Sequence, residues 1–338
     1  MSTFQRRVRE DFMKQIRSDS ALGENPWLRD MLRLWRPPGE LIGEHGIELA
    51  SSGAEGLSPS QMQTHLRLAI RALTINLYRN GQSVARIGLN RKGKIQAWIH
   101  NKYVGGDDME GGYTTVNHAG VKDPATGQFV PYEGTAQLYT WIARANDHGG
   151  REKEFVDLVV ARNPNVIDLE TGLPAYSKER TAPRMDLVAL ECLGNGKGWQ
   201  VVFWEAKLVT NGEARCQGES REPKVVAQLR EYTKWLEYED HEIQMAEECK
   251  HTCEILVGLH EVAKRIRPDI EELGIGIQEV AKPGAALPLI DKKPRLLIDD
   301  RKKKVAFRKN GHLEKLLNMG LHVQMVENDD ELTLETCA

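Results

Sequence analysis

The stretch RMDLVALECLGNGKGWQVVFWEAKL, residues 184–208, decides the fold. Two runs of apolar and β-branched residues flank a glycine-rich segment, residues 193–198. Asn195-Gly196 is a dipeptide preferred in two-residue type I′ turns, so the stretch predicts an antiparallel hairpin. In the register that this turn sets, Asp186 lies directly opposite Glu205. A bulge near the glycines would change that pairing.

The predicted hairpin gathers charged side chains on one face. Opposed side chains lie about 4.5–5.5 Å apart at Cβ, and Lys207, two residues beyond Glu205, shares their face. Two carboxylates held together repel each other unless a cation or proton lies between them. Asp186 and Glu205, with the carbonyl of Ala206, are oxygen ligands that suit Mg²⁺ or Mn²⁺. A lysine beside the metal can orient or deprotonate an attacking water. The alternative interpretation is an exposed strand end with a structural ion pair.

Two helices are expected to flank this hairpin. Residues 151–162 form a predicted helix that ends at Asn163-Pro164 and brings Glu152 and Glu154 upstream of the strands. These two glutamates are two positions apart and cannot both face inward; Glu154 is preferred because it stacks with Leu158. After the hairpin, Gln228 and Tyr232 share one face of a second predicted helix.

In this order of elements the chain resembles the PD-(D/E)XK nuclease superfamily, and most of all the Shedu-type nucleases of bacterial anti-phage defence. The resemblance covers residues 150–240, roughly a quarter of the chain, and is carried by Asp186, Glu205-Ala206-Lys207, Gln228 and Tyr232. Pro183 stands three residues before Asp186, whereas the pattern that names the superfamily has it adjacent.

The resemblance implies Mg²⁺-dependent hydrolysis of DNA phosphodiester bonds. Asp186, Glu205 and Ala206 would hold the metal with Glu154 or Glu152. Lys207 would position the water or stabilise charge on the phosphate, and Gln228 would steady the site. Tyr232 would either do the same or only pack. The implied fold is a restriction-endonuclease-like three-layer α/β/α core with a central mixed sheet.

Outward from this region, the pattern predicts two domains. Helices and strands alternate from residue 149 to 338, which is typical of a layered α/β domain. Residues 1–148 predict a smaller α+β domain. Its expected elements are helices over 4–35, 62–80 and 135–146, a hairpin of strands at 83–89 and 94–104, and a long loop over 105–135, with a short strand inside this loop as the alternative.

The charge balance is uneven along the chain. Lys and Arg number 46 against 49 Asp and Glu, a net charge of -3, but no acidic residue occurs between Glu55 and Asp107. That stretch and the basic run at 292–309 predict contacts with phosphate groups, although a solvated face is the alternative. The predicted nucleic-acid contacts are Arg67, Arg71, Arg79, Arg86, Arg91, Lys92, Lys94, Lys102, Lys302 and Lys303.

Several classes of protein lack support in the sequence. Five cysteines without a C-x-x-C pair do not make a disulfide scaffold. There is neither a signal peptide nor an apolar run long enough to span a membrane, so we expect a cytoplasmic protein. Phosphate-binding loops and H-E-x-x-H zinc sites are absent, and sparse aromatic residues fit a glycosidase poorly.

Two function classes stay open. The first is a Mg²⁺-dependent endonuclease acting on DNA, with RNA not excluded. The second is a nucleic-acid-binding or regulatory protein on a nuclease-like fold, with cleavage supplied by a partner protein. We expect a homo-oligomer in either case, because nucleases of this type commonly pair to reach both strands.

Overall fold

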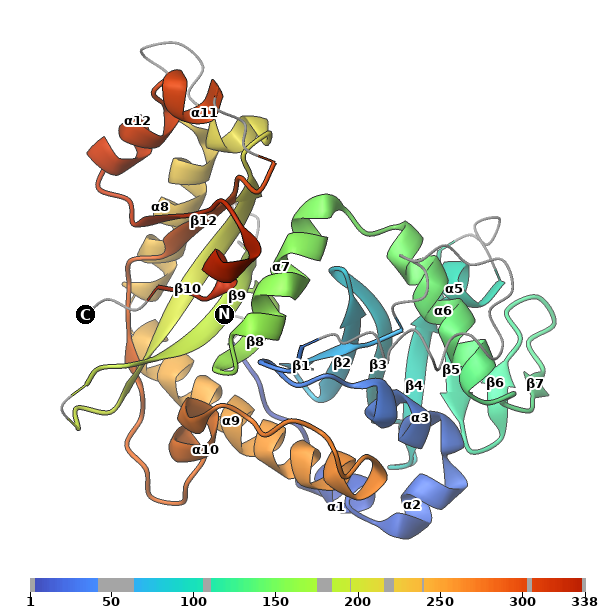
Figure 1. Ribbon diagram of the computed structural model, residues 1–338. Helices are drawn as coiled ribbons and strands as arrows, with labels where there is room; N and C mark the ends of the chain where they lie inside the picture. The colour runs from blue at the N-terminus through green and yellow to red at the C-terminus, as the bar shows by residue number, and fades with distance from the viewer. Residues whose placement is uncertain are drawn as a thin grey trace. The chain divides into compact units, whose positions relative to one another are not determined.

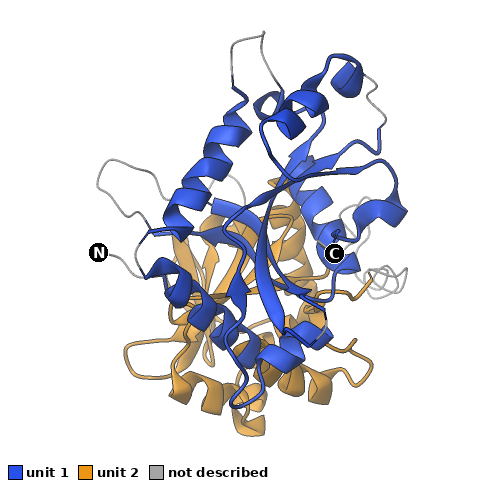
Figure 2. Cartoon of the chain, turned by 90° about the vertical axis from the view of Figure 1, so that its left-hand side faces the viewer, with its two compact units in different colours: residues 1–5, 151–254, 274–338 blue, residues 6–150, 255–273 orange. Residues whose placement is uncertain are grey.

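The chain folds into two compact units, which Figure 2 colours separately. The computed structural model describes residues 4–41, 64–105, 111–174, 184–194, 196–215, 222–238, 240–302 and 306–335. Unit 1 comprises Met1–Gln5, Arg151–Glu254 and Gly274–Ala338, and unit 2 comprises Arg6–Gly150 and Ile255–Leu273. The predicted division into 1–148 and 149–338 differs from this partition at two places: residues 255–273 belong with the N-terminal unit, and residues 1–5 belong with the C-terminal one.

Unit 2 is built on an antiparallel sheet in which each strand pairs with the next along the chain (Figure 1). Its described strands are β1 (Arg67–Arg71), β2 (Thr74–Arg79), β3 (Gln82–Leu89), β4 (Ile95–His100), β5 (Tyr113–Asn117), β6 (Gly120–Lys122) and β7 (Phe129–Val130). Its helices are α1 (Glu10–Ile16), α2 (Asp19–Glu24), α3 (Pro26–Leu34), α5 (Asn101–Gly105) and α6 (Thr135–Asp147).

The predicted helix over 62–80 is wrong. The described part of this segment forms β1 and β2, which pair antiparallel from Arg67 opposite Tyr78 to Arg71 opposite Thr74. The turn between them carries Leu73 at a φ of 62°, a conformation that is uncommon for a residue other than glycine. The predicted loop over 105–135 contains β5, β6 and β7.

Other predictions for this unit are confirmed, except that residues 101–104 of the predicted second strand belong to helix α5. The hairpin of β3 and β4 pairs Leu89 with Ile95 across its turn. Along β4 the side chains of Ile95, Ala97 and Ile99 are buried, while the alternate ones are half-buried, as the period of two in a strand requires. A helix forms over α6, and the N-terminal helical region is divided into α1, α2 and α3.

Unit 1 is built on a mixed sheet in the order β13-β12-β10-β9-β8, with β11 beside β10. β10 runs parallel to β12 and antiparallel to β9, and β8 is a strand that the sequence pattern did not predict. The strands are β8 (Val166–Gly172), β9 (Arg184–Cys192), β10 (Trp199–Leu208), β11 (Leu289–Ile290), β12 (Arg295–Asp299) and β13 (Val323–Val326).

The described helices of unit 1 begin with the two that were predicted to flank the hairpin. They are α7 (Arg151–Arg162), α8 (Lys224–Leu236), α10 (Ile275–Val280), α11 (Ala306–Lys309) and α12 (His312–Asn318), with short 3-10 turns at Gly212–Ala214 and Asp329–Leu332. The long helix α9 (His241–Ile266) begins in unit 1 and ends in unit 2. The chain is therefore a mixed α/β protein with two sheets. No described helix is long and apolar enough to cross a membrane.

The register of the decisive hairpin is confirmed. β9 and β10 pair without a shift from Cys192 opposite Trp199 to Leu187 opposite Trp204, and one further step along this register sets Asp186 against Glu205. At the turn, Lys197 N–H donates to the carbonyl of Gly194 at 2.9 Å. Asn195 lies outside the described residues, so the type I′ conformation stays a prediction.

Candidate active site

Asp186 and Glu205 are buried side by side at the end of the β9–β10 hairpin. Their residues are 4% and 2% exposed. The Oδ2 atom of Asp186 accepts a hydrogen bond from the Ala206 N–H at 2.8 Å, which holds this carboxylate across to the neighbouring strand. The two strands thus fix an acidic pair within a largely apolar hairpin.

Glu205 is held by three side chains. Its Oε1 accepts hydrogen bonds from Lys207 Nζ at 2.6 Å and from Gln228 Nε2 at 2.8 Å. Tyr232 OH lies 3.0 Å from Oε2 and also contacts the carbonyl of Arg184. Because a hydroxyl carries a single hydrogen, it donates to one of these two oxygens at a time. The structure therefore brings Gln228 and Tyr232 of α8 onto the hairpin carboxylate, and Tyr232 does more than pack.

Helix α7 brings Glu152 toward this cluster. Glu152 Oε1 lies 3.5 Å from Lys207 Nζ, and its Oε2 accepts a hydrogen bond from Asn211 Nδ2 at 2.9 Å. Glu154 is exposed. The sequence-based preference for Glu154 is therefore corrected: the direction in which α7 crosses the hairpin turns Glu152, and not Glu154, toward Lys207.

Lys153 is a site residue that the sequence pattern missed. Its ammonium donates to Asp186 Oδ1 at 2.6 Å and forms an ion pair with Glu170 on β8. The Glu170 side chain is only 4% exposed. A physical signal was present in the sequence, because a buried aspartate needs a cation and Lys153 is the one lysine of α7.

The cluster holds more acidic than basic groups. Among the described residues, the carboxylates of Asp186 and Glu170 contact Lys153, and those of Glu205 and Glu152 contact Lys207. The half-exposed Glu213 also reaches Lys207, and the exposed Arg184 also reaches Glu170. With all four acids ionised, this core carries two excess negative charges.

The acidic excess shifts several pKa values. Burial, and next the charge of Asp186, raises the pKa of Glu205 to about 7. Burial alone would lower the pKa of Lys207, but the carboxylates of Glu205 and Asp186 outweigh it and raise the pKa. Burial likewise opposes the charge of Lys153, and Asp186 and Glu170 together raise its pKa. Both lysines are therefore cationic at neutral pH.

The donor set fits a divalent cation in part. Within the described residues, no group of three or more Asp, Glu, His or Cys side chains is arranged to bind a metal. Mg²⁺, however, is commonly held by one or two carboxylates and completes its shell with water and phosphate oxygens. Asp186 and Glu205 supply such a pair.

Two of the predicted nucleic-acid contacts are structural. Arg67 is 3% exposed and donates to the carbonyls of Arg36 and Pro37. Arg79 is 2% exposed and contacts His65 and Asn146. Both guanidinium groups lie inside unit 2, so these two predictions are corrected.

The remaining predicted contacts that the structure describes are at or near the surface. Arg71 and Lys102 are half-buried, and Lys303 lies outside the described residues. The exposed members are Arg86, Arg91, Lys92, Lys94 and Lys302.

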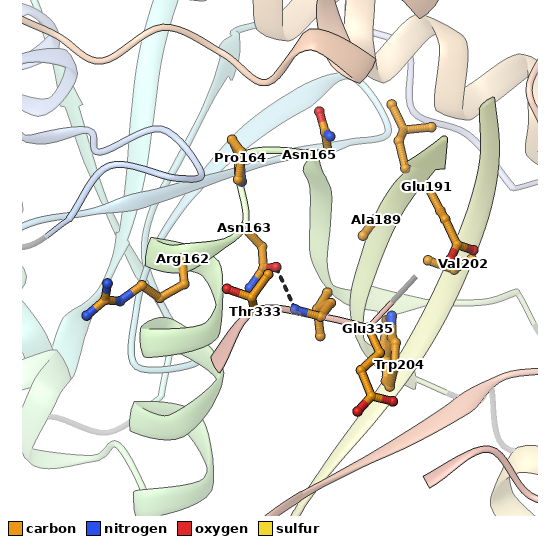
Figure 3. A pocket seen from close by; sticks show the side chains of 12 residues that line it. Arg162, Asn163, Pro164, Asn165, Ala189, Glu191, Val202, Trp204, Thr333 and Glu335 are labelled. Atoms are coloured by element: carbon orange, nitrogen blue, oxygen red, sulfur yellow. Dashed lines mark hydrogen bonds between the residues drawn. The ribbon is translucent and has the colours of Figure 1, made fainter. Parts of the chain in front are cut away.

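A cavity of about 180 Å³ lies elsewhere in unit 1 (Figure 3). Trp204 lines it, and because Trp204 and Glu205 are consecutive in a strand, their side chains point to opposite faces of the sheet. Asn163 also lines the cavity, accepts a hydrogen bond from Leu334 N–H at 2.8 Å and donates to the carbonyl of Leu332. The cavity is thus closed partly by the C-terminal segment and is separate from the carboxylate cluster.

No protein-family model, no curated protein and no solved structure matches this chain. The resemblance to the PD-(D/E)XK nucleases therefore stays a prediction from sequence. The interpretation of the site rests on its own geometry and charge.

Proposed function

We propose that this protein is a metal-dependent nuclease that uses Mg²⁺ or Mn²⁺ to hydrolyse phosphodiester bonds of DNA. One observation carries the proposal: Asp186 and Glu205 are buried together across β9 and β10, with Lys207 bonded to Glu205 and an excess of acid around them. A buried acidic excess is costly unless a cation completes it. In a phosphate-cleaving site such a cation and a neighbouring lysine can both stabilise the charge that develops on the phosphate.

The arrangement of elements supports a restriction-endonuclease-like core. The chain runs from the acidic helix α7 to the Asp186 strand, the Glu205-x-Lys207 strand and the helix with Gln228 and Tyr232. These elements surround a mixed sheet, and in Figure 1 α7 and α8 appear on either side of β9 and β10. We propose a three-layer α/β/α architecture for unit 1 on this basis.

Each residue of the cluster has a defined part in the proposed reaction. Asp186 and Glu205 would hold the metal, which when bound supplies positive charge to the scissile phosphate. Because the pKa of Lys207 is raised, its ammonium suits charge stabilisation on the phosphate and orientation of water better than removal of a proton. Gln228 and Tyr232 fix the Glu205 carboxylate, and Lys153 fixes Asp186.

The first test is cleavage of supercoiled plasmid DNA in Mg²⁺. We expect Asp186→Asn and Lys207→Ala to slow cleavage at least about a hundredfold, since each removes charge that acts on the transition state. Glu154→Gln, at the exposed neighbouring position on α7, is the matched control and should cut like the wild type. Equal cutting by the wild type, Asp186→Asn and Lys207→Ala would exclude this site as the source of activity.

The second test separates the enzyme from the alternative, a nucleic-acid-binding or regulatory protein that does not cleave. Calorimetric titration with Mn²⁺ should show binding by the wild type and its loss in Glu205→Gln, a change that keeps the shape of the side chain but removes the charge. An absence of binding by the wild type would favour the alternative. Titration of Glu154→Gln provides the baseline.

The biological setting belongs to the same proposal. The resemblance points to anti-phage defence or restriction, with a homo-oligomer acting in the cytoplasm and a partner protein as a further source of regulation. Parallel digestion of DNA and RNA substrates, with sedimentation analysis of the active species, would test substrate class and assembly.

A further inference from the structure

The β3, β4 and β5 strands of unit 2 carry a cluster of aromatic and cationic side chains on one side of the sheet. We call Arg86, Trp98, His100 and Tyr113 the stacking face. Arg86 pairs with Trp98 across β3 and β4, and His100 pairs with Tyr113 across β4 and β5. Trp98 and His100 alternate with the buried Ile95, Ala97 and Ile99, so all four side chains lie on the face opposite the apolar core.

Contacts within the stacking face join its members. The Arg86 guanidinium lies 5.3 Å from the centre of the Tyr113 ring, so this side chain reaches across β4. The His100 and Tyr113 rings are 5.4 Å apart. A Cβ added at Gly88 would meet Trp98 Cζ3 at 3.4 Å and Leu73 O at 3.2 Å, so the glycine leaves room for the indole to lie against the sheet. The rings are thus arranged by the strands and by each other.

The stacking face is accessible. Tyr113 is 52% exposed, Arg86 is exposed, and Trp98 and His100 are half-buried. Large aromatic side chains and a guanidinium therefore stay in contact with solvent, although their own strands have a complete apolar face. Exposed aromatic groups of this kind are typical of binding surfaces.

The charge of the sheet points to an anionic partner. None of the seven described strands β1 to β7 contains Asp or Glu. The turn between β3 and β4 adds the exposed Arg91, Lys92 and Lys94. Lys94 shares the alternation of Trp98 and His100, which sets it in line with the stacking face.

We infer that the stacking face binds single-stranded DNA. Aromatic rings on a sheet stack with bases, and neighbouring cations contact the phosphates. A duplex hides the faces of its bases inside its own stack, so rings in this position favour unpaired strands. The choice of DNA rests on the proposed function. The surface itself lies in unit 2 and needs no metal, so binding and cleavage can be tested separately.

The test is fluorescence anisotropy of a labelled oligothymidylate in buffer with EDTA, where metal-dependent cleavage cannot contribute. We expect the wild type to bind, and Trp98→Ala and Tyr113→Ala each to weaken binding at least about fivefold, as measured for the loss of one stacked base. Trp98→Phe keeps a ring and should retain most of the affinity. Phe129→Ala, which removes another exposed ring from the same sheet (43% exposed), is the matched control and should bind like the wild type.

Defined results would overturn the inference. One is wild-type protein that does not bind the oligomer; another is Trp98→Ala, shown to be folded by circular dichroism, that binds as tightly as Phe129→Ala. Equal competition by duplex DNA would exclude selectivity for single strands, and tighter binding of oligouridylate would reassign the face to RNA. Binding without cleavage would count against the proposed nuclease alone, and cleavage without this binding would count against the stacking face alone.

Discussion

At the scale of single residues, the site shows which side chains a sequence pattern can place together. The period of two in a strand put Asp186, Glu205 and Lys207 on one face, and the spacing of four in a helix put Gln228 beside Tyr232. Such patterns could not predict that Lys153 and Glu170 meet at this site. Their meeting depends on where α7 crosses the sheet and on β8, where Glu170 has a φ of 51°. The choice between Glu152 and Glu154 depended on the same crossing.

The raised pKa of Glu205 predicts a pH-dependent stability. Between about pH 4.5 and about pH 7 the folded protein keeps a proton on Glu205 that the unfolded chain loses, so stability falls as pH rises through this window. Above pH 7 the full decrease in the free energy of unfolding is reached, on the order of 3 kcal/mol. Urea unfolding in EDTA at about pH 5 and about pH 8 measures it. Glu205→Gln should have a smaller decrease, and an unchanged decrease would contradict the assignment to Glu205.

At the scale of elements, the β9–β10 and β1–β2 hairpins differ in how clearly the sequence marks them. The β9–β10 hairpin has apolar strands on both sides of glycine-rich residues, and its register could be predicted. The β1–β2 hairpin turns at Ala72 and Leu73 without a glycine. Its apolar residues at 66, 69, 70, 73 and 77 also match the period of a helix. β2 also pairs with β3 across the two-residue turn Asn80-Gly81, both residues having positive φ. This dipeptide favours a hairpin and is the local signal against a helix here.

The C-terminal end of α7 is tied to the C-terminal segment by one side chain. Asn163 is 7% exposed and bonds to the carbonyls of Val159 and Leu332 and to Leu334 N–H. Asn163→Ala should lower the free energy of unfolding by about 2–3 kcal/mol, because buried backbone groups lose their partners. Urea unfolding measures this, and the exposed Asn310→Ala is the control. If Asn163→Ala lowers the free energy of unfolding no more than the control does, water replaces these hydrogen bonds without destabilising the protein.

At the scale of the whole molecule, the sequence indicated a change of pattern near residue 150. It did not indicate that a later segment of the chain packs back into the N-terminal unit. Residues 255–273 complete unit 2 from a position far along the sequence. There, Arg267 donates to both carboxylate oxygens of Glu40 and to the carbonyl of Trp35. Periodicity identifies this segment as helical but carries no information about the unit it joins.

A fragment limited to residues 6–150 should therefore fold poorly. It would leave Glu40 without Arg267 and would uncover Trp35, against which the His260 ring packs. We expect rapid proteolysis and weak chemical-shift dispersion in its NMR spectrum. The same fragment with residues 255–273 joined by a flexible linker is the control and should be markedly more resistant. Equal resistance of the two would show that the N-terminal segment is complete alone.

The division of α9 between the units also affects protein synthesis. A ribosome adds roughly 5 to 20 residues per second, so several seconds separate the appearance of residue 150 from that of residue 255. During this interval unit 2 has each of its described strands but lacks residues 255–273. The part of its apolar surface that this segment covers therefore stays exposed. Nascent chains paused between these positions are thus the stage at which chaperone binding should be greatest.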